Sequence, residues 1–145
     1  MGFEGDTNMI GKLAYRVQAM VGLPARALRR VADLLAMDLD HEFELGRDPY
    51  GDPWAPLSDV TLASGRTPPP LTDTRNMRDS VKVRPKSPSD ILITIDHPAM
   101  PHQTGWNGKS GKGPARPMVP NRDEVPANWA HSIESAVEAE FRRPL

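Results

Sequence analysis

The sequence predicts an α+β fold, with helices near both ends of the chain and a small antiparallel sheet between them. Two patterns favour this class. Apolar residues recur at three- and four-residue steps in residues 9–44 and again after Pro126, which is the period of amphipathic helices. Apolar and polar residues alternate in residues 81–84 and 91–96, which is the period of strands. Separate runs of helix and strand are typical of α+β proteins.

Two helices are expected at the start of the chain. The first covers residues 9–21, where four apolar residues share one helical face: Ile10, Leu13, Val17 and Met20. Gly22 ends this pattern, and Pro24 starts a second helix that runs through Glu44. Gly46 is its natural C-terminal cap. The chain is therefore expected to form a single domain, in which residues 1–22 are a helical arm and residues 23–145 are the core.

A proline-rich loop follows in residues 48–58, because Pro49, Pro53 and Pro56 exclude a regular helix or a central strand. Tyr50 and Trp54 are expected to anchor this loop by burying their rings. Beyond the loop, Ser58 is expected to cap a short helical turn, and the three consecutive prolines in residues 64–70 predict an extended connector.

The second half of the chain carries the predicted sheet. A helical turn in residues 71–79, starting at Thr72 or Asp73, leads into two strands joined by a turn at residues 86–90. Four glycines make residues 104–113 a predicted mobile loop. A C-terminal helix is expected from Pro126, because four apolar residues form one stripe on it: Trp129, Ile133, Val137 and Phe141.

Composition limits the classes of function. The chain has 145 residues, 38% apolar residues and 16 prolines, so a compact monomer would be marginal and contacts with partners could supply missing burial. Without cysteine there is no disulfide framework and no thiolate metal site. A net charge of -1 argues against a globally basic nucleic-acid binder. No apolar run reaches the roughly 20 residues of a membrane span, so a soluble protein made in the cytoplasm is expected.

Few residues are arranged for catalysis, and no cofactor or metal is expected. Asp96, His97 and His102 could hold a metal, but the histidines do not have the i, i+4 spacing of the metalloprotease motif. His102 and Gln103 are instead expected to hydrogen-bond backbone in a segment broken by prolines. The serines fall at caps and turns, outside any nucleophile motif. The sequence thus favours a protein that is not an enzyme.

Four residues are candidates for a subunit interface. Lys109 and Lys112 lie in the glycine-rich loop, which is either a solvated linker or a segment that orders against a neighbouring subunit or DNA. Two prolines flank Arg116 and hold its backbone, so it is either a residue fixed in a salt bridge to a carboxylate, within the fold or across an interface, or a merely exposed arginine. Trp106 is either a packing residue or an interface anchor.

Five sequence pieces occur in a familiar order: an aromatic-ended helix, "DPYGDPWAPLS" with "TL" after it, "L.DT..MRDSV", a strand pair, and "HQTG" followed by "GPARPMV". From residue 43 to the C-terminus the chain resembles the phage virion morphogenesis or tail-completion family of Mu-like and P2-like tailed phages. The resemblance implies a structural neck protein of the virion, located at the head–tail junction. It implies a hexameric ring that contacts the tail terminator and the head–tail connector or adaptor and lets genome DNA pass without sequence recognition.

Two other classes of function remain open from the residues alone. A small metal-dependent hydrolase would use Asp96, His97 and His102. A nucleic-acid-binding accessory protein would use the arginine-bearing N-terminal helices, and its DNA affinity would fall steeply with salt.

Overall fold

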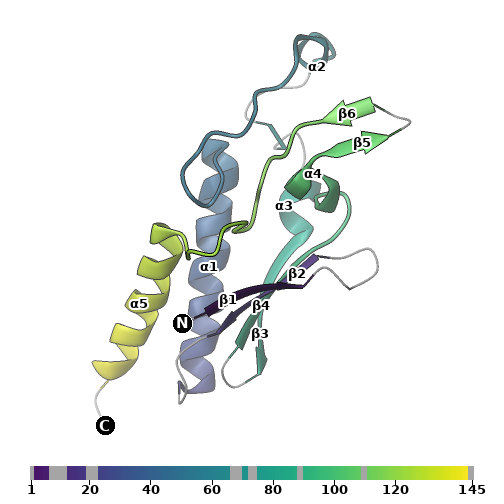
Figure 1. Cartoon of the computed structure of the whole chain (residues 1–145). Helices are drawn as coiled ribbons and strands as arrows, with labels where there is room; N and C mark the ends of the chain where they lie inside the picture. Colours follow the sequence, from purple (N-terminus) through teal and green to yellow (C-terminus); the bar gives the residue numbers. More distant parts are fainter. Residues whose placement is uncertain are drawn as a thin grey trace.

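The computed structural model describes residues 2–6, 13–18, 23–65, 70–71, 75–87, 90–108 and 111–143. Figure 1 shows the elements, which follow one another along the chain as β1 (Gly2–Asp6), β2 (Leu13–Gln18), α1 (Ala25–Leu45), α2 (Asp59–Ala63), α3 (Asn76–Asp79), β3 (Val81–Ser87), β4 (Asp90–Ile95), α4 (Met100–Thr104), β5 (Trp106–Gly108), β6 (Gly111–Gly113) and α5 (Ala127–Phe141). The predicted α+β class is confirmed.

Within the described residues, the main sheet is antiparallel and has four strands in the order β1-β2-β4-β3, and β5 and β6 form a separate hairpin. The predicted strand pair is confirmed, with Val81 opposite Ile95 and Val83 opposite Ile93. The predicted turn is shorter than expected, because β3 continues to Ser87 and β4 begins at Asp90. Pro88 and Ser89 lie outside the described residues.

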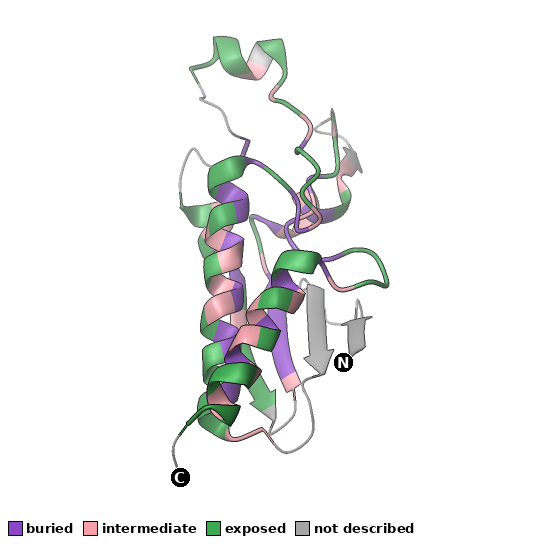
Figure 2. Ribbon diagram, turned by 90° about the vertical axis from the view of Figure 1, so that its left-hand side faces the viewer, coloured by how far each residue is buried: buried purple, intermediate pink, exposed green. Residues whose placement is uncertain are grey.

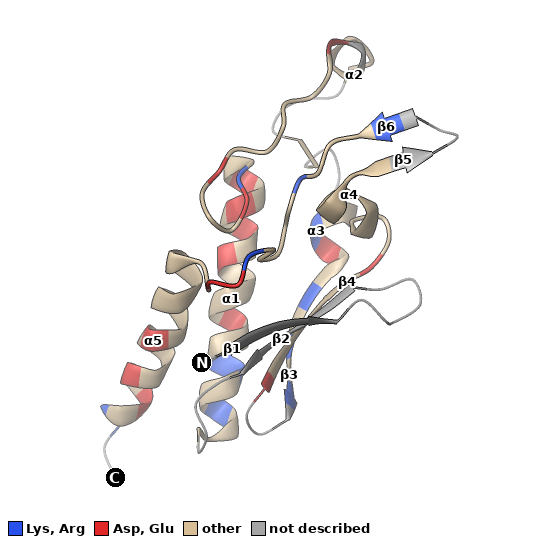
Figure 3. Cartoon of the chain, viewed as in Figure 1, with Lys and Arg blue, Asp and Glu red and all other residues tan. Residues whose placement is uncertain are grey.

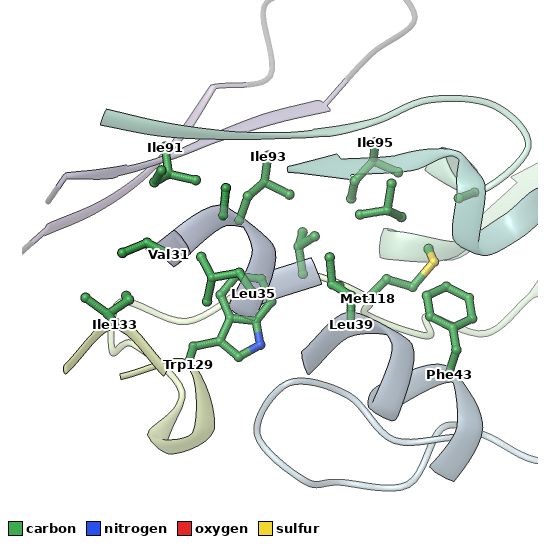
Figure 4. Packing of buried hydrophobic residues seen from close by; sticks show 14 of the residues in the cluster. Val31, Leu35, Leu39, Phe43, Ile91, Ile93, Ile95, Met118, Trp129 and Ile133 are labelled. Atoms are coloured by element: carbon green, nitrogen blue, oxygen red, sulfur yellow. The ribbon is translucent and has the colours of Figure 1, made fainter. Parts of the chain in front are cut away.

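Helix α1 is the centre of the fold and lies between the sheet and α5 (Figure 1). Figure 4 shows how Val31, Leu35 and Leu39 of α1 pack between the strand residues and Trp129 of α5. This helix is the second one predicted from the sequence, and it ends as expected at Gly46, whose φ of 66° is left-handed. Figure 2 shows the buried stripe along α1 and the exposed face that it leaves to solvent.

The first predicted helix, in residues 9–21, is wrong where the structure describes it. Leu13–Gln18 is strand β2, which pairs with β1 on one side and β4 on the other. This segment fits the strand period as well as the helix period, since Leu13, Tyr15 and Val17 stand at every second position. Register sets these three opposite the apolar β4 residues, so pairing with a distant strand overrode the local helical pattern. The expected caps, Thr7 and Asn8, lie outside the described residues.

Three further expectations change in detail. Helix α3 begins at Asn76, while the expected start at Thr72 or Asp73 lies outside the described residues. The C-terminal helix is confirmed as α5, but its buried stripe does not reach Phe141, which is 77% exposed. Ser58 does cap α2, because its Oγ accepts a hydrogen bond from the Thr61 amide at 3.2 Å.

The predicted loop of residues 104–113 contains regular structure. Thr104 ends α4, and the chain then forms the hairpin of β5 and β6, while Lys109 and Ser110 lie outside the described residues. Glycine content suggested a loop, but glycines here allow a close cross-strand approach. None of the helices in the described part of the chain combines the length and apolarity needed to span a membrane.

A candidate assembly interface at the proline-rich end

Two proline-rich segments, residues 48–58 and residues 114–120, lie side by side at the end of the molecule where α1 finishes. Trp54 of the first segment is 5% exposed, and its indole Nε1 donates a hydrogen bond to the Pro117 carbonyl of the second at 2.7 Å. Its ring meets Phe43 of α1 edge-on, with 5.2 Å between the ring centroids. A buried indole with a satisfied N–H is a strong anchor, so Trp54 fixes the first segment both to the helix and to the second segment.

The turn before Trp54 is held by Asp48 and Tyr50. The Asp48 carboxylate accepts hydrogen bonds from the amides of Tyr50 at 2.9 Å and Asp52 at 3.0 Å, so a side chain replaces a backbone partner in the turn. The Tyr50 hydroxyl donates to the Glu124 carbonyl at 2.9 Å, and the Arg122 guanidinium lies 4.3 Å from the centroid of the Tyr50 ring. Tyr50 therefore ties the turn to the segment that precedes α5.

Arg116 is buried, with 6% of its surface exposed. Its Nε donates to the Ala55 carbonyl at 2.8 Å, and its Nη2 donates to the Pro56 carbonyl at 3.0 Å. The sequence suggested either a carboxylate partner or an exposed side chain, whereas the described hydrogen bonds of this guanidinium go to backbone. Burial lowers the pKa of Arg116 from its usual value. Arg116 thus holds the point from which the chain leads toward α2.

Gln103 joins α4 to the second proline-rich segment and is 2% exposed. Its Nε2 donates to the Val119 carbonyl at 3.0 Å, while its Oε1 accepts from the amides of Met118 at 2.8 Å and Val119 at 3.2 Å. One side chain therefore satisfies three buried backbone groups that have no strand partner.

His102 lies edge-on to Trp106, with 4.8 Å between ring centroids, and its Nδ1 is buried without a hydrogen-bond partner. Burial lowers the pKa of His102, and the nearby positive charge of Arg116 lowers it further, so the ring is neutral at pH 7. Within the described residues no group of three histidine, aspartate or glutamate side chains is placed to hold a metal. In this part of the chain, the geometry thus gives the hydrolase alternative no metal centre.

Trp106 pairs across the hairpin with Gly113, and its ring fills the space beside that glycine. A Cβ built on Gly113 would lie 2.0 Å from the ring, so only glycine fits here. Lys112 is exposed on β6, and Figure 3 shows part of β6 in the blue of basic residues. Lys109 lies outside the described residues. The interface roles of Trp106, Lys109, Lys112 and Arg116 stay predictions.

A buried carboxyl group was missed by sequence reasoning. Glu42 of α1 is 8% exposed, and its Oε1 accepts a hydrogen bond from the Trp129 Nε1 of α5 at 2.7 Å. Desolvation raises the pKa of Glu42 to about 9, so the group is protonated at neutral pH. The sequence feature that could have revealed this burial is position, because Glu42 follows Leu35 and Leu39 at helical steps on the apolar face of α1.

A separate hollow of about 320 Å³ lies near α3 and is lined by Asn76, Asp79, Ser80, Lys82, Asp96, His97 and Pro98. Ser80 is committed to the fold, since its Oγ donates to the Asn76 carbonyl at 2.5 Å. The Asp96 carboxylate accepts from the His97 amide at 2.9 Å. Among the contacts of the described residues, these polar groups hold the turn, and no nucleophile is paired with a base.

A sequence model of the phage virion morphogenesis family matches residues 6–141, which is nearly the whole chain. The chain belongs to the phage virion morphogenesis family. No curated protein and no solved structure matches it significantly. The resemblance inferred from the proline-rich motifs is therefore confirmed, and the match extends further toward the N-terminus than those motifs. A virion morphogenesis protein has a structural part in building the phage particle.

Proposed function

We propose that this virion morphogenesis protein is a tail-completion component of the phage neck. It forms a hexameric ring at the head–tail junction, contacts the tail terminator and the head–tail connector, and lets genome DNA pass. The family match over residues 6–141 is the observation that carries this proposal. The motifs behind the resemblance meet in one place, since Trp54 and Arg116 join the two proline-rich segments and Gln103 joins α4 to the second of them.

Exposed apolar residues support an assembly role. Four large apolar side chains of the described residues are open to solvent on the isolated subunit: Met37, Leu45, Leu62 and Phe141. They lie on three separate helices, so the subunit offers more than one apolar contact surface. A closed ring requires two different complementary patches on each subunit, and this distribution is compatible with that requirement.

Passage of DNA requires a lumen that attracts phosphates without reading sequence. Exposed basic side chains on strand β3 suit this role: Lys82, Arg84 and Lys86. Contacts of this kind bind through counterion release and weaken as salt rises. The basic strand β3 and Lys112 are therefore our candidates for lumen-facing residues.

The solution mass of the purified protein, measured by light scattering over a range of concentration and salt, tests the proposal. We expect a discrete ring, alone or after neck or tail components are added. A monomer that ignores these components in every condition would contradict the tail-completion role.

A further inference from the structure

The contact between α1 and α5 combines apolar packing with hydrogen bonds to carboxyl groups. Figure 4 shows Trp129 of α5 packed beside Leu35 of α1. The Trp129 Nε1 donates to the Glu42 Oε1 at 2.7 Å, and the Ser132 hydroxyl donates to the Asp38 Oδ2 at 2.6 Å. Both donors belong to α5 and both acceptors to α1. The first half of α5 is therefore held by two side-chain bonds that end on carboxyl groups of α1.

Glu42 is an unusual acceptor, because its carboxyl group is buried and only half satisfied. The residue is 8% exposed, and its second oxygen, Oε2, has no hydrogen-bond partner. Desolvation raises the pKa of Glu42 to about 9, and the like charges of Asp38 and Asp48 raise it further. Burying an unpaired charge is so costly that such a group takes up a proton instead. The Glu42 carboxyl group is thus neutral at neutral pH while α5 covers it.

Two groups oppose this desolvation. The hydrogen bond from Trp129 lowers the pKa of Glu42, and the positive charge of Arg78 on α3 lowers it as well. The Arg78 guanidinium is committed elsewhere, because its Nε donates to Asp40 at 2.6 Å and its other two nitrogens donate to backbone carbonyls at 2.9 and 3.1 Å. An ionised Glu42 would therefore have no ion-pair partner among the described residues.

Asp38 places a second carboxyl group in the same contact. Burial raises the pKa of Asp38, whereas the bond from Ser132 and the charges of His41 and His131 lower it. Asp38 and Glu42 stand four residues apart on α1, and like charges at this spacing repel each other. The surface on which α5 rests thus becomes self-repelling when Glu42 ionises.

The second half of α5 is held less firmly. Glu140 pairs with Arg26 at the start of α1, but the Arg26 side chain is 50% exposed, and exposed ion pairs contribute little to stability. Phe141 at the end of α5 is 77% exposed and adds no burial against α1. Helix α5 is also the last element of the described chain, so it can leave α1 without disturbing the strand order of the sheet. Elements of this kind open at a lower free energy than the whole fold.

We propose that α5 is a releasable helix, which leaves α1 as a unit once Glu42 loses its proton. Departure of α5 lets water reach the carboxylate, which removes the cost of burying its charge. It also uncovers the apolar face of α1 that Trp129 covers (Figure 4), and an apolar surface of this kind favours contact with another protein. The inference is independent of the proposed ring, because every group in it belongs to one subunit.

The direction of the pH dependence follows from the two states of Glu42. With α5 in place its pKa is about 9, and with α5 released the pKa returns toward 4.5. The released state therefore binds fewer protons, so its population rises with pH between these two values and levels off above them. The rise is at most about tenfold per pH unit.

Thiol labelling measures this opening, because the chain has no native cysteine. Ala136→Cys places a thiol on the buried stripe of α5, and Ala99→Cys places one in the rest of the core, since both alanines are at most 1% exposed. Each labelling rate is divided by the rate of the same chain unfolded in urea at the same pH, which cancels the ionisation of the thiol itself. We expect the Ala136→Cys chain to react at least about tenfold faster than the Ala99→Cys chain, and increasingly so up to about pH 9.

Glu42→Gln in the Ala136→Cys chain is the matched control. Glutamine keeps an acceptor for Trp129 and cannot ionise, so the corrected labelling rate should stay flat over the same pH range. A rise with pH in this variant would overturn the role of Glu42. Equal rates at the two thiols would show that α5 leaves only when the whole core unfolds, which overturns the release of α5 as a unit.

Hydrogen exchange of the unsubstituted chain gives a second reading that requires no variant to fold. After correction for the intrinsic exchange rate, the amides of α5 should exchange faster than those of α1, and the difference should grow with pH. Equal protection of the two helices at every pH would contradict the proposal.

Discussion

The body of this virion morphogenesis protein and its proline-rich end are stabilised by different interactions. In the body, α1 buries apolar side chains such as Leu35 and Leu39 against strands and α5. At the proline-rich end, Trp54, Gln103 and Arg116 direct polar atoms to backbone carbonyls and amides. The difference follows from proline, which lacks an N–H and cannot build a strand ladder, so side chains must satisfy the backbone instead.

This contrast shows that the proline-rich end depends on particular polar atoms, whereas the body depends mainly on the volume of its apolar side chains. Apolar burial in the body is non-directional, so a substitution that conserves volume should cost little. Hydrogen bonds at the proline-rich end depend on particular atoms, so an equally conservative change there should cost more. The two regions can therefore be distinguished by comparing the stability lost when a substitution removes side-chain volume with the stability lost when it removes polar atoms.

The largest loss of stability is expected for Leu39→Ala in the body. Leu39 is fully buried, and removing a buried leucine side chain typically costs about 2–5 kcal/mol through lost burial and a residual cavity. Urea unfolding followed by circular dichroism measures the change. Arg29→Ala on the exposed face of the same helix is the control and should stay within about 0.5 kcal/mol of the parent. Equal effects at the two positions would show that α1 is not the centre of the core.

Next in size, Gln103→Met should destabilise the proline-rich end. The change keeps the side-chain volume but leaves the Met118 amide and both backbone groups of Val119 without their partner. Unsatisfied buried groups cost about 1–3 kcal/mol each, so a loss on the order of 3 kcal/mol is expected by the same urea titration. Leu35→Met is the matched change in the body and should cost less than about 1.5 kcal/mol. If the two variants lose the same amount, the contrast between the regions fails.

A pH-dependent loss of stability is expected from Glu42. Its pKa is raised from 4.5 to about 9 in the folded protein, so the folded state holds a proton that the unfolded state releases. The stability from this group is complete below pH 4.5 and falls as pH rises toward 9, by at most about 1.4 kcal/mol per pH unit. Glu42→Gln keeps an acceptor for Trp129 and cannot ionise.

Unfolding free energies of the parent and Glu42→Gln, measured from pH 5 to pH 9, test this expectation. The parent should lose stability with rising pH, and the variant should follow a flatter curve. Parallel curves would mean that Glu42 is ionised in the folded protein and that its burial is overcome by some other interaction.

The smallest effect on stability is expected for a double alanine variant of Lys109 and Lys112. Lys112 is exposed, and surface substitutions away from caps and networks usually change stability by less than about 0.5 kcal/mol. Particle assembly or infectivity should nevertheless fall, as measured by complementation of a phage that lacks the protein. A normal titre would remove the glycine-rich segment from the interface.

Local sequence patterns were sufficient to predict the elements whose apolar residues fit only one period, that of a helix or that of a strand. Helix α1 and strand β4 fall in this class, because their apolar residues recur over many positions. Strand β2 does not, since Leu13–Gln18 fits both periods and its outcome depended on pairing with β4, about 80 residues away in sequence. A contact at that distance leaves no trace in a short sequence window.

The candidate site was predicted in part for the same reason. Flanking prolines indicated that Arg116 is fixed, but its partners, the carbonyls of Ala55 and Pro56, carry no side-chain signal. Backbone acceptors of this kind become visible only when the two segments are placed together. The projecting α2 was likewise predicted as a turn, and its distance from the body could not be read from its residues.

The packing of Trp106 on Gly113 limits which sequences this family member can accept. At Gly113 the limit is space, since any Cβ would overlap the indole ring. At Gly51 the limit is backbone conformation alone, because its φ is 91° and nothing lies within 4 Å of a Cβ there. Saturation mutagenesis should therefore accept asparagine or aspartate at Gly51 and no replacement at Gly113. Gly51 and Gly113 look alike in the sequence, but they differ in which substitutions they can accept during evolution.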